Sequence, residues 1–275
     1  MGRPKGSKNR STVEREARDR VELSDKLNIY STHNMKSPSQ MFEDMNNLSL
    51  MVAAGVSPSL LITGTPGLGK TYHVTTMLNK IGYVDGREYI HVKGRSTAAG
   101  LFITLYENQD KLIIFDDCDN VFKDPDAVNL LKGALDSYDR RIISWISARP
   151  LKDGDGDPLP KNFEFTGRII FISNLSVHRI DAAIRSRSFT MELSLTAAQM
   201  LDRMQDLLPV IEPNVTDLTI KQEALEALIY AHENFAGVEL NFRSLIKAIR
   251  IRQMNFDNWR DMVVEQVIAA EILFN

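Results

Sequence analysis

The sequence predicts an α/β protein with a mostly parallel sheet, followed by a smaller region made only of helices. Apolar segments typical of strands alternate with amphipathic helical segments up to residue 193, which favours a parallel sheet with helices on its faces. Beyond residue 193 only helical patterns occur. We therefore expect a basic and charged flexible tail over residues 1–28, an α/β domain over 29–193 and a helical domain over 194–275.

The composition describes a chain that can bury a core and carries little net charge. It has 275 residues, of which 43% are hydrophobic and 25% charged, and its formal net charge is -3. A single cysteine excludes an internal disulfide framework and suits a reducing compartment. No apolar run approaches the length of a membrane span, and no apolar stretch of a secretory signal follows the basic start. We expect a cytoplasmic protein without a membrane partner.

Strands and helices are expected in regular order. The lead-in carries a weakly amphipathic helix over 39–55, and the tail a short one over 12–27. Strand patterns are found at 59–64, 88–93, 111–117 and 188–193, with helices between them at 70–82, 96–109, 126–137 and 177–187.

The remaining segments predict a hairpin and the helical region. The segments 140–147 and 161–174 enclose a turn-rich stretch, which predicts a β-hairpin just before a further core strand. Four helices are expected after residue 193, over 196–208, 219–235, 241–254 and 258–274.

A glycine-rich loop joins the first core strand to its helix. The stretch GTPGLGKT fits G-x-x-x-x-G-K-[ST] and lies between a strand and a helix, as this motif requires. Its glycines let backbone N–H groups surround phosphates, and the helix N-terminus adds partial positive charge. We expect Lys70 to reach the β- and γ-phosphates of a nucleotide and Thr71 to bind Mg²⁺. The predicted phosphate-binding residues are Gly64, Thr65, Pro66, Gly67, Leu68, Gly69, Lys70 and Thr71.

Two consecutive acids end a later strand. In LIIFDD, four apolar residues precede Asp116 and Asp117. We expect Asp116 to hold the Mg²⁺ shell and Asp117 to polarise the attacking water. The alternative is an acidic loop after a core strand, and the phosphate-binding loop earlier in the chain favours the catalytic interpretation.

Three polar residues follow the next core strand. IIFISN ends in Asn174, which can orient the water or contact the γ-phosphate, or can simply end the strand. One short helix later come Arg185 and Arg187. These arginines are either solvated surface side chains or functional, and their place after the Asn174 strand favours function.

These motifs, in this order, resemble the AAA+ ATPase superfamily over roughly residues 40 to 275. The resemblance implies a three-layer P-loop domain with a helical lid, ATP and Mg²⁺ as cofactors, and a homo-oligomer, commonly a hexameric ring or a helical assembly. It implies that Arg187 reaches a neighbouring subunit's γ-phosphate as the arginine finger, with Arg185 as the alternative. It also implies a second sensor at Arg243, where a basic helix face is the alternative.

One position departs from the family's pattern. Most members carry Asp-Glu where this chain has Asp116 and Asp117. Aspartate is one methylene shorter than glutamate, so the water must lie closer to the backbone. The hypothesis that follows is that the isolated protein hydrolyses ATP slowly.

The loop after segment 88–93 suggests DNA as a partner. It offers Lys93 and Arg95 and no aromatic residue, whereas protein unfoldases that resemble this chain usually place an aromatic residue there. A basic loop suits a phosphate backbone, and a solvated loop is the alternative.

The tail suggests DNA independently. GRPKGSKNR resembles an AT-hook, in which Arg3 would enter an A·T-rich minor groove. Lys5, Lys8 and Arg10 would add phosphate contacts. The alternative is a solubilising tail.

The hairpin tip LKDGDGDPLP is acidic, which counts against a tip that grips DNA. Asp153, Asp155, Asp157 and Glu164 follow the spacing of a Ca²⁺ loop, but Pro158 stands where that loop needs glycine. We interpret the tip as a plain acidic turn.

The leading hypothesis is an ATP-hydrolysing oligomeric motor or remodeller that acts on DNA in replication, recombination or transposition, encoded by a phage and located in the host cytoplasm. One alternative is a remodeller of a partner protein complex. The other is a nucleotide-switched scaffold on DNA with slow hydrolysis.

Overall fold

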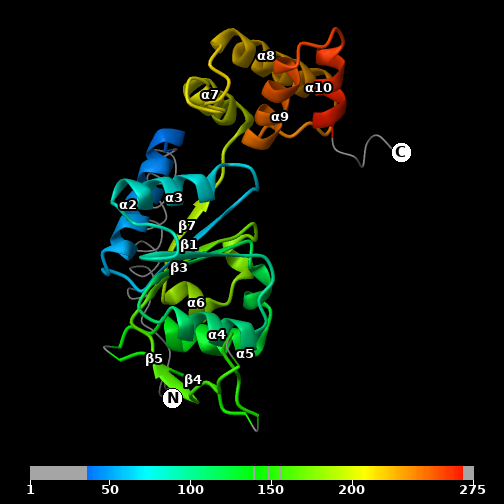
Figure 1. The fold of residues 1–275 in the computed structure, drawn as a ribbon. Coiled ribbons are helices and arrows are strands. Elements are labelled where there is room, and N and C mark those ends of the chain that lie inside the picture. The colour runs from blue at the N-terminus through cyan, green and yellow to red at the C-terminus, as the bar shows by residue number, and fades with distance from the viewer. Residues whose placement is uncertain (1–35, 139, 148, 155, 269–275) are drawn as a thin grey trace, which may run out of the picture. The chain divides into compact units, whose positions relative to one another are not determined.

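Five parallel strands form the main sheet of the computed structural model, in the order β2-β3-β6-β1-β7 (Figure 1). Residues 36–268 are described, except 139, 148 and 155. The strand bounds are β1 Ser59–Gly64, β2 Tyr89–Lys93, β3 Leu112–Asp116, β6 Arg168–Ile172 and β7 Phe189–Leu193. Each neighbouring pair is parallel, so all five strands end at the same edge.

Helices cover both faces of this sheet. Side chains alternate along each strand: in β1, Leu60 and Ile62 enter one apolar cluster and Leu61 the other. The first cluster packs against α2 Pro38–Ala53 and α3 Lys70–Lys80, and the second against α4 Ala98–Glu107, α5 Pro125–Ala134 and α6 Ala182–Ser186. The strands are almost wholly apolar because both faces are buried. The predicted three-layer α/β fold is confirmed.

Up to residue 268, where the described part ends, four helices follow the sheet: α7 Ala197–Leu207, α8 Leu218–Asn234, α9 Phe242–Gln253 and α10 Trp259–Val267. The first begins with a capping box, in which Thr196 and Gln199 bond each other's backbone N–H groups. Apolar side chains of this helical region join the cluster on the α2 face of the sheet. The helical region is confirmed, while the domain boundary between residues 193 and 194 stays a prediction.

The hairpin before β6 is also present. β4 Ile142–Ser144 pairs antiparallel with β5 Asn162–Glu164, and a further bridge joins Lys152 to Pro158. The segment 161–174 thus holds two strands: β5 is the second arm of the predicted hairpin, and β6 is the further core strand.

Two expected helices differ from the structure. The segment 177–187 splits into a short 3-10 helix, η2 Val177–Arg179, and α6, because the Asp181 side chain accepts the Ala183 N–H at 2.8 Å and starts a new helix. The helix predicted over 258–274 ends at Val267, since Ile268 is extended and bridges to Val238.

Some expectations concern residues outside the described part. They are the AT-hook residues Arg3, Lys5, Lys8 and Arg10, the short helix over 12–27, and residues 269–275. Within the described residues, no helix has both the length and the apolar character that crossing a membrane requires.

Candidate functional site

The loop between β1 and α3 has a backbone that favours glycine. Gly67 and Gly69 have φ angles of 78° and 82°, in the left-handed region. A Cβ on Gly64 would lie 2.1 Å from the Leu193 carbonyl oxygen, and one on Gly67 would lie 2.8 Å from the Asn241 Cβ. The glycines of the motif are therefore required by close approach as well as by backbone conformation.

Lys70 begins α3 and holds this loop from inside. It is 5% exposed, and its Nζ donates to the carbonyl oxygens of Gly64 at 2.7 Å and Thr65 at 2.9 Å. A third bond reaches Asn174 Oδ1 at 3.0 Å. Burial lowers the pKa of the ammonium, while the nearby carboxylates of Asp117 and Asp116 oppose this effect. The lysine thus joins the glycine-rich loop to Asn174, which lies two residues beyond the end of β6.

Thr71 and Asp116 meet at the end of β3. The Thr71 hydroxyl lies 3.0 Å from both carboxylate oxygens of Asp116. His91 of β2 lies on the other side, with its Nε2 3.1 Å from Asp116 Oδ2. A hydroxyl and a carboxylate are oxygen ligands of the kind that Mg²⁺ prefers, so this pair fits a magnesium site.

Asp117 and Asn174 face each other across the strand ends. The Asn174 amide donates to Asp117 Oδ1 at 2.6 Å. Because β6 lies between β1 and β3, Asn174 can contact both Lys70 and Asp117. Partial burial raises the pKa of Asp117, and Asp116 and Asp119 add to this shift.

The backbone of Asp117 explains why this residue is short. Its φ is 56°, in the left-handed region that aspartate tolerates better than longer side chains do. The departure from Asp-Glu therefore agrees with the local turn that follows β3.

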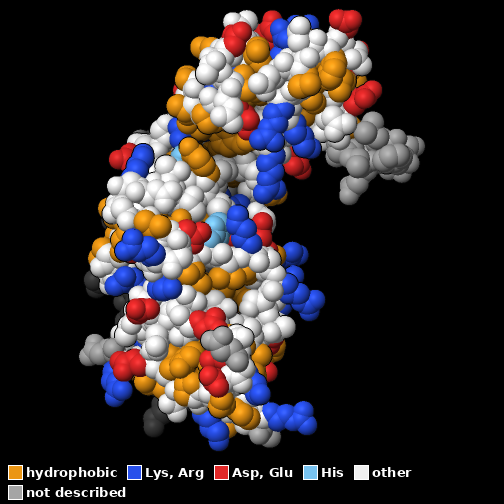
Figure 2. All heavy atoms as spheres, viewed as in Figure 1, with side chains coloured by type: hydrophobic (Ala, Val, Ile, Leu, Met, Phe, Trp, Pro, Cys, Tyr) orange, Lys and Arg blue, Asp and Glu red, His pale blue; other side chains and the backbone are white. Residues whose placement is uncertain are grey.

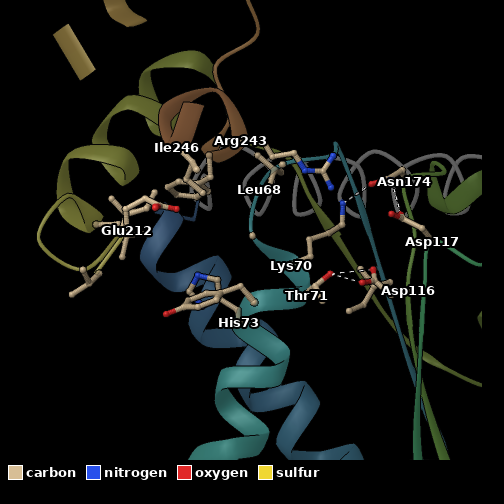
Figure 3. A pocket seen from close by; sticks show the side chains of 18 of the residues that line it. Leu68, Lys70, Thr71, His73, Asp116, Asp117, Asn174, Glu212, Arg243 and Ile246 are labelled. Atoms are coloured by element: carbon tan, nitrogen blue, oxygen red, sulfur yellow. Dashed lines mark hydrogen bonds between the residues drawn. The ribbon is translucent and has the colours of Figure 1, made fainter. Parts of the chain in front are cut away.

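These side chains line a pocket of about 480 Å³ (Figure 3). Its polar end holds Lys70, Thr71, Asp116, Asp117 and Asn174. Its other end is mostly apolar and combines α3 with the helical region: Leu68, Tyr72, His73, Leu207, Val210, Ile211, Pro213, Phe242 and Ile246. The volume and the two contrasting ends suit a ligand with a charged part and a flat apolar part.

His73 is the main polar side chain that α3 adds to the apolar end. Its ring lies 4.3 Å from the Phe42 ring, and the Arg203 guanidinium covers the same Phe42 ring at 4.9 Å. Burial lowers the pKa of His73 to about 4, with smaller contributions from Arg203 and Lys80. At neutral pH this imidazole is uncharged.

The first turn of α9 brings the helical region to the glycine-rich loop. The Phe242 N–H donates to the Gly67 carbonyl oxygen at 2.9 Å, and Asn241 caps the helix through the Ser244 N–H at 3.0 Å. Figure 3 shows the Arg243 side chain pointing toward Lys70 and Asn174. The structure thus brings Arg243 together with the motif residues, although its sensor role stays a prediction.

The two candidate finger arginines lie elsewhere. Arg185 and Arg187 are on and just after α6, and neither lines the pocket. Arg185 Nε donates to the Ile180 carbonyl oxygen at 3.1 Å, and Arg187 Nη1 donates to the Ala183 carbonyl oxygen at 3.0 Å. Arg187 Nε is buried without a hydrogen bond.

Lys93 and Arg95 are exposed at the end of β2 and just beyond it, and neither lines the pocket. On the face shown in Figure 2, Lys and Arg side chains gather where the helical region adjoins the sheet.

The hairpin tip is held by its own turn. Asp153 Oδ1 accepts the Asp157 N–H at 2.8 Å, while Glu164 pairs with Arg140 at 3.1 Å. Asp155 lies outside the described residues. Within the described residues, no group of three or more His, Cys, Asp or Glu side chains is placed to hold a metal ion.

Sequence reasoning missed His73, His91 and the Phe242 contact. His91 could have been noticed, because it is a polar residue inside the apolar strand segment EYIHVK. No local pattern indicates His73 or Phe242, because their place in the pocket depends on how the helical region packs.

The chain is similar to known proteins in sequence and in fold. Residues 60–197 match the model of the family described as "ATPase family associated with various cellular activities (AAA)". An uncharacterized 36.7 kDa protein in the nrdC-mobD intergenic region of Enterobacteria phage T4 is 32% identical over 180 residues, which cover 61% of this chain. This chain spans 54% of that relative's length.

A solved structure has the same fold. RuvB from Thermotoga maritima, solved as a variant, superposes with a TM-score of 0.50 over 83% of this chain and 69% of its own, at 14% sequence identity.

Proposed function

Because the chain belongs to the AAA family of ATPases, we propose that it binds ATP with Mg²⁺, hydrolyses it in a homo-oligomer and acts on DNA. The observation that carries the proposal is the convergence of Lys70, Thr71, Asp116, Asp117 and Asn174 at one end of one pocket. In this proposal Lys70 binds the phosphates, and Thr71 and Asp116 hold Mg²⁺, which would neutralise phosphate charge.

The two acids then have different roles: Asp116 holds Mg²⁺, and Asp117 acts on the attacking water. Asp117 accepts a proton from the attacking water, and Asn174, 2.6 Å from Asp117, orients that water. Arg243 approaches the phosphate end from α9, so it would bind the nucleotide in the same subunit. The apolar end takes the base, where His73 offers an uncharged ring.

The homo-oligomer is supported by the position of the two candidate arginine fingers, which are absent from the pocket of their own chain. Arg185 and Arg187 lie after α6 and do not line it. As in the family, we propose that Arg187 completes the pocket of a neighbouring subunit, with Arg185 as the alternative. The hexameric state is part of this proposal.

DNA as the partner is supported by the exposed pair Lys93 and Arg95. A phosphate backbone attracts such charges, and the attraction weakens as salt rises. The basic residues of the tail, Arg3, Lys5, Lys8 and Arg10, would add affinity, and several tails in one oligomer would act together. The relative from phage T4 supports a phage source and action in the host cytoplasm.

One observation favours a second candidate, a nucleotide-switched scaffold on DNA. Asp117 is short, is held by Asn174 and sits on a left-handed backbone turn. Each feature limits how far its carboxylate reaches toward water. In this version the protein assembles on ATP and hydrolyses it slowly.

The test is the rate of ATP hydrolysis with and without duplex DNA. We compare the full chain, a chain lacking residues 1–20, and the double variant Lys93→Ala and Arg95→Ala. The charge-matched control is Lys80→Ala with Arg87→Ala, which changes two exposed cations elsewhere. The proposal expects stimulation by DNA that the control keeps and the other two variants reduce.

The other outcomes separate the alternatives. Assembly on ATP with almost no turnover would favour the scaffold. Hydrolysis that DNA leaves unchanged would contradict the DNA proposal and direct the search to a partner protein complex.

A further inference from the structure

The turn that follows β3 lies between two parts of the site. This turn contains the 3-10 helix η1, Asp119–Phe122. The helix begins two residues after Asp117, which is the first residue beyond β3. In the sheet, β3 stands between β2 and β6, so η1 meets the loops that follow both neighbours. Those loops are the one carrying Asn174 and the one carrying Lys93 and Arg95.

On the β6 side, η1 holds the residue next to Asn174. Asp119 Oδ1 accepts the Ser173 hydroxyl at 2.5 Å, and the same hydroxyl oxygen accepts the Leu175 N–H at 3.0 Å. Ser173 is only 1% exposed. The residue before Asn174 is therefore bonded to η1, while the Asn174 amide bonds Lys70 and Asp117.

On the β2 side, η1 holds the basic loop. The Asn120 side chain accepts the Ser96 N–H at 3.3 Å and donates to the Ser96 carbonyl oxygen. Both backbone groups of Ser96 are thus bound by one side chain. Gly94, with a φ of 89° in the left-handed region, lies between the end of β2 and Ser96, and its N–H donates to the Asp116 carbonyl oxygen at 3.4 Å.

We infer that Asn120 is a positioning residue that links the nucleotide state at Asn174 to the position of loop 93–97. This inference rests on the proposed function, because it assigns a use to the same pocket and the same basic loop. The link is a contiguous chain of contacts from Lys70 through Asn174, Ser173 and the Asp119–Asn120 turn to Ser96.

The element with two arrangements is the Lys70–Asn174 bond. When Lys70 turns to a phosphate, Asn174 loses one of its two partners and is held by Asp117 alone. The adjoining Ser173 transmits that change to η1, and Asn120 carries it to Ser96. Coupling between two sites requires such a difference between states.

The experiment reads the loop directly and without DNA. Arg95→Cys is labelled with an environment-sensitive fluorophore, and the emission is compared in ATP with Mg²⁺ and in ADP. The native Cys118 is buried, and burial raises the pKa of its thiol to about 11, so it competes poorly for the label.

Three second-site variants are compared in this background. Asn120→Ala removes both bonds to Ser96, and Asn120→Asp keeps only the acceptor for the Ser96 N–H. The control, Asn129→Ala, removes an exposed asparagine of α5 whose amide oxygen lies 3.5 Å from Lys132 Nζ. Nucleotide affinity and thermal stability are measured for each.

We expect the emission change in the labelled parent and in the control. It should fall by about fivefold or more in Asn120→Ala and less in Asn120→Asp, with nucleotide affinity unchanged. An undiminished change in Asn120→Ala would overturn the inference, as would a parent that binds nucleotide but gives no change. A parent that binds no nucleotide would overturn the proposed function and the inference with it. A labelled parent that responds to ATP, together with a wild-type chain that binds no DNA in a separate titration, would contradict only the DNA proposal.

Discussion

The two ends of the pocket differ in how their side chains are held. At the phosphate end, Lys70, Thr71, Asp116, Asp117 and Asn174 are joined by hydrogen bonds of 2.6–3.0 Å. At the other end, side chains of α3 and of the helical region meet mainly by packing. Directional bonds fix the first end closely, whereas the second depends on where the helical region lies. Substitutions at the phosphate end should therefore change the hydrolysis rate, the ATP affinity or both, whereas those at the apolar end should change the affinity alone.

The largest effect on the hydrolysis rate should come from a residue that lies at neither end of the pocket. Arg187→Ala should lower the hydrolysis rate about 1000-fold, since an arginine finger contributes on that order to phosphoryl transfer. ATP binding should be retained, because Arg187 does not line its own chain's pocket. Mixing the variant with wild-type subunits and measuring turnover checks the role in trans. Loss in simple proportion to dilution would contradict it, and Arg185→Ala is the companion variant.

Asp117→Asn should lower turnover about 100-fold or more, since a general base contributes on that order. The amide keeps nearly the same shape but cannot take the proton, so nucleotide affinity should stay within about twofold. Single-turnover hydrolysis and nucleotide titration measure the two quantities separately. If affinity fell as far as the rate, Asp117 would be a binding residue instead.

Lys70→Ala should weaken ATP binding about 30- to 100-fold, because a hydrogen bond to a charged group and its Coulomb attraction are both lost. Lys70→Arg is the partner variant, since it keeps the charge but not the fit beside Gly64 and Thr65. Titration with a fluorescent nucleotide gives both affinities. Equal affinity of Lys70→Ala and wild type would remove Lys70 from the phosphate site.

The pH dependence of turnover should reflect the raised pKa of Asp117. The base works when it is deprotonated, so the rate should hold above the raised pKa and fall about tenfold per pH unit below it. The acid limb should therefore begin above the pH expected for an ordinary aspartate. A rate–pH profile at saturating ATP checks this. A limb at the ordinary aspartate value would mean that another group controls the rate.

The smallest effect belongs to the apolar end. Ile246→Ala should weaken ATP binding about fivefold, corresponding to about 1 kcal/mol of apolar contact, and leave the saturated rate unchanged. Ile251→Ala on the same helix is the control, because Ile251 does not line the pocket. A change in the saturated rate would contradict the division between the two ends.

The phosphate end was predictable because its residues follow local rules. Two motifs can be recognised from the local sequence: the glycine spacing before Lys70, and the pair of acids after an apolar strand. Parallel strands end at a common edge, so Asn174 could be expected beside them. The single helix expected over 177–187 was wrong because an aspartate, Asp181, provides a helix cap in its middle.

The apolar end was not predictable in the same way. Which residues of α7 and α9 line the pocket depends on tertiary packing, and apolar residues at helical spacing look alike whether they line a pocket or a core. The contact between His91 and Asp116 depends on the register of β2 against β3, in which Lys93 lies opposite Asp116. Register between distant strands leaves no local mark in the sequence.

The strand order has a consequence for the newly made chain. β1 lies between β6 and β7, and Ser59 pairs with Ile169, more than a hundred residues further along. Synthesis at about 5–20 residues per second would leave the apolar β1 segment without either neighbour for some seconds. The strand that leads into the glycine-rich loop is thus among the first made and the last to be enclosed. Slow closure of the sheet and a need for protection during synthesis follow from the order of its strands.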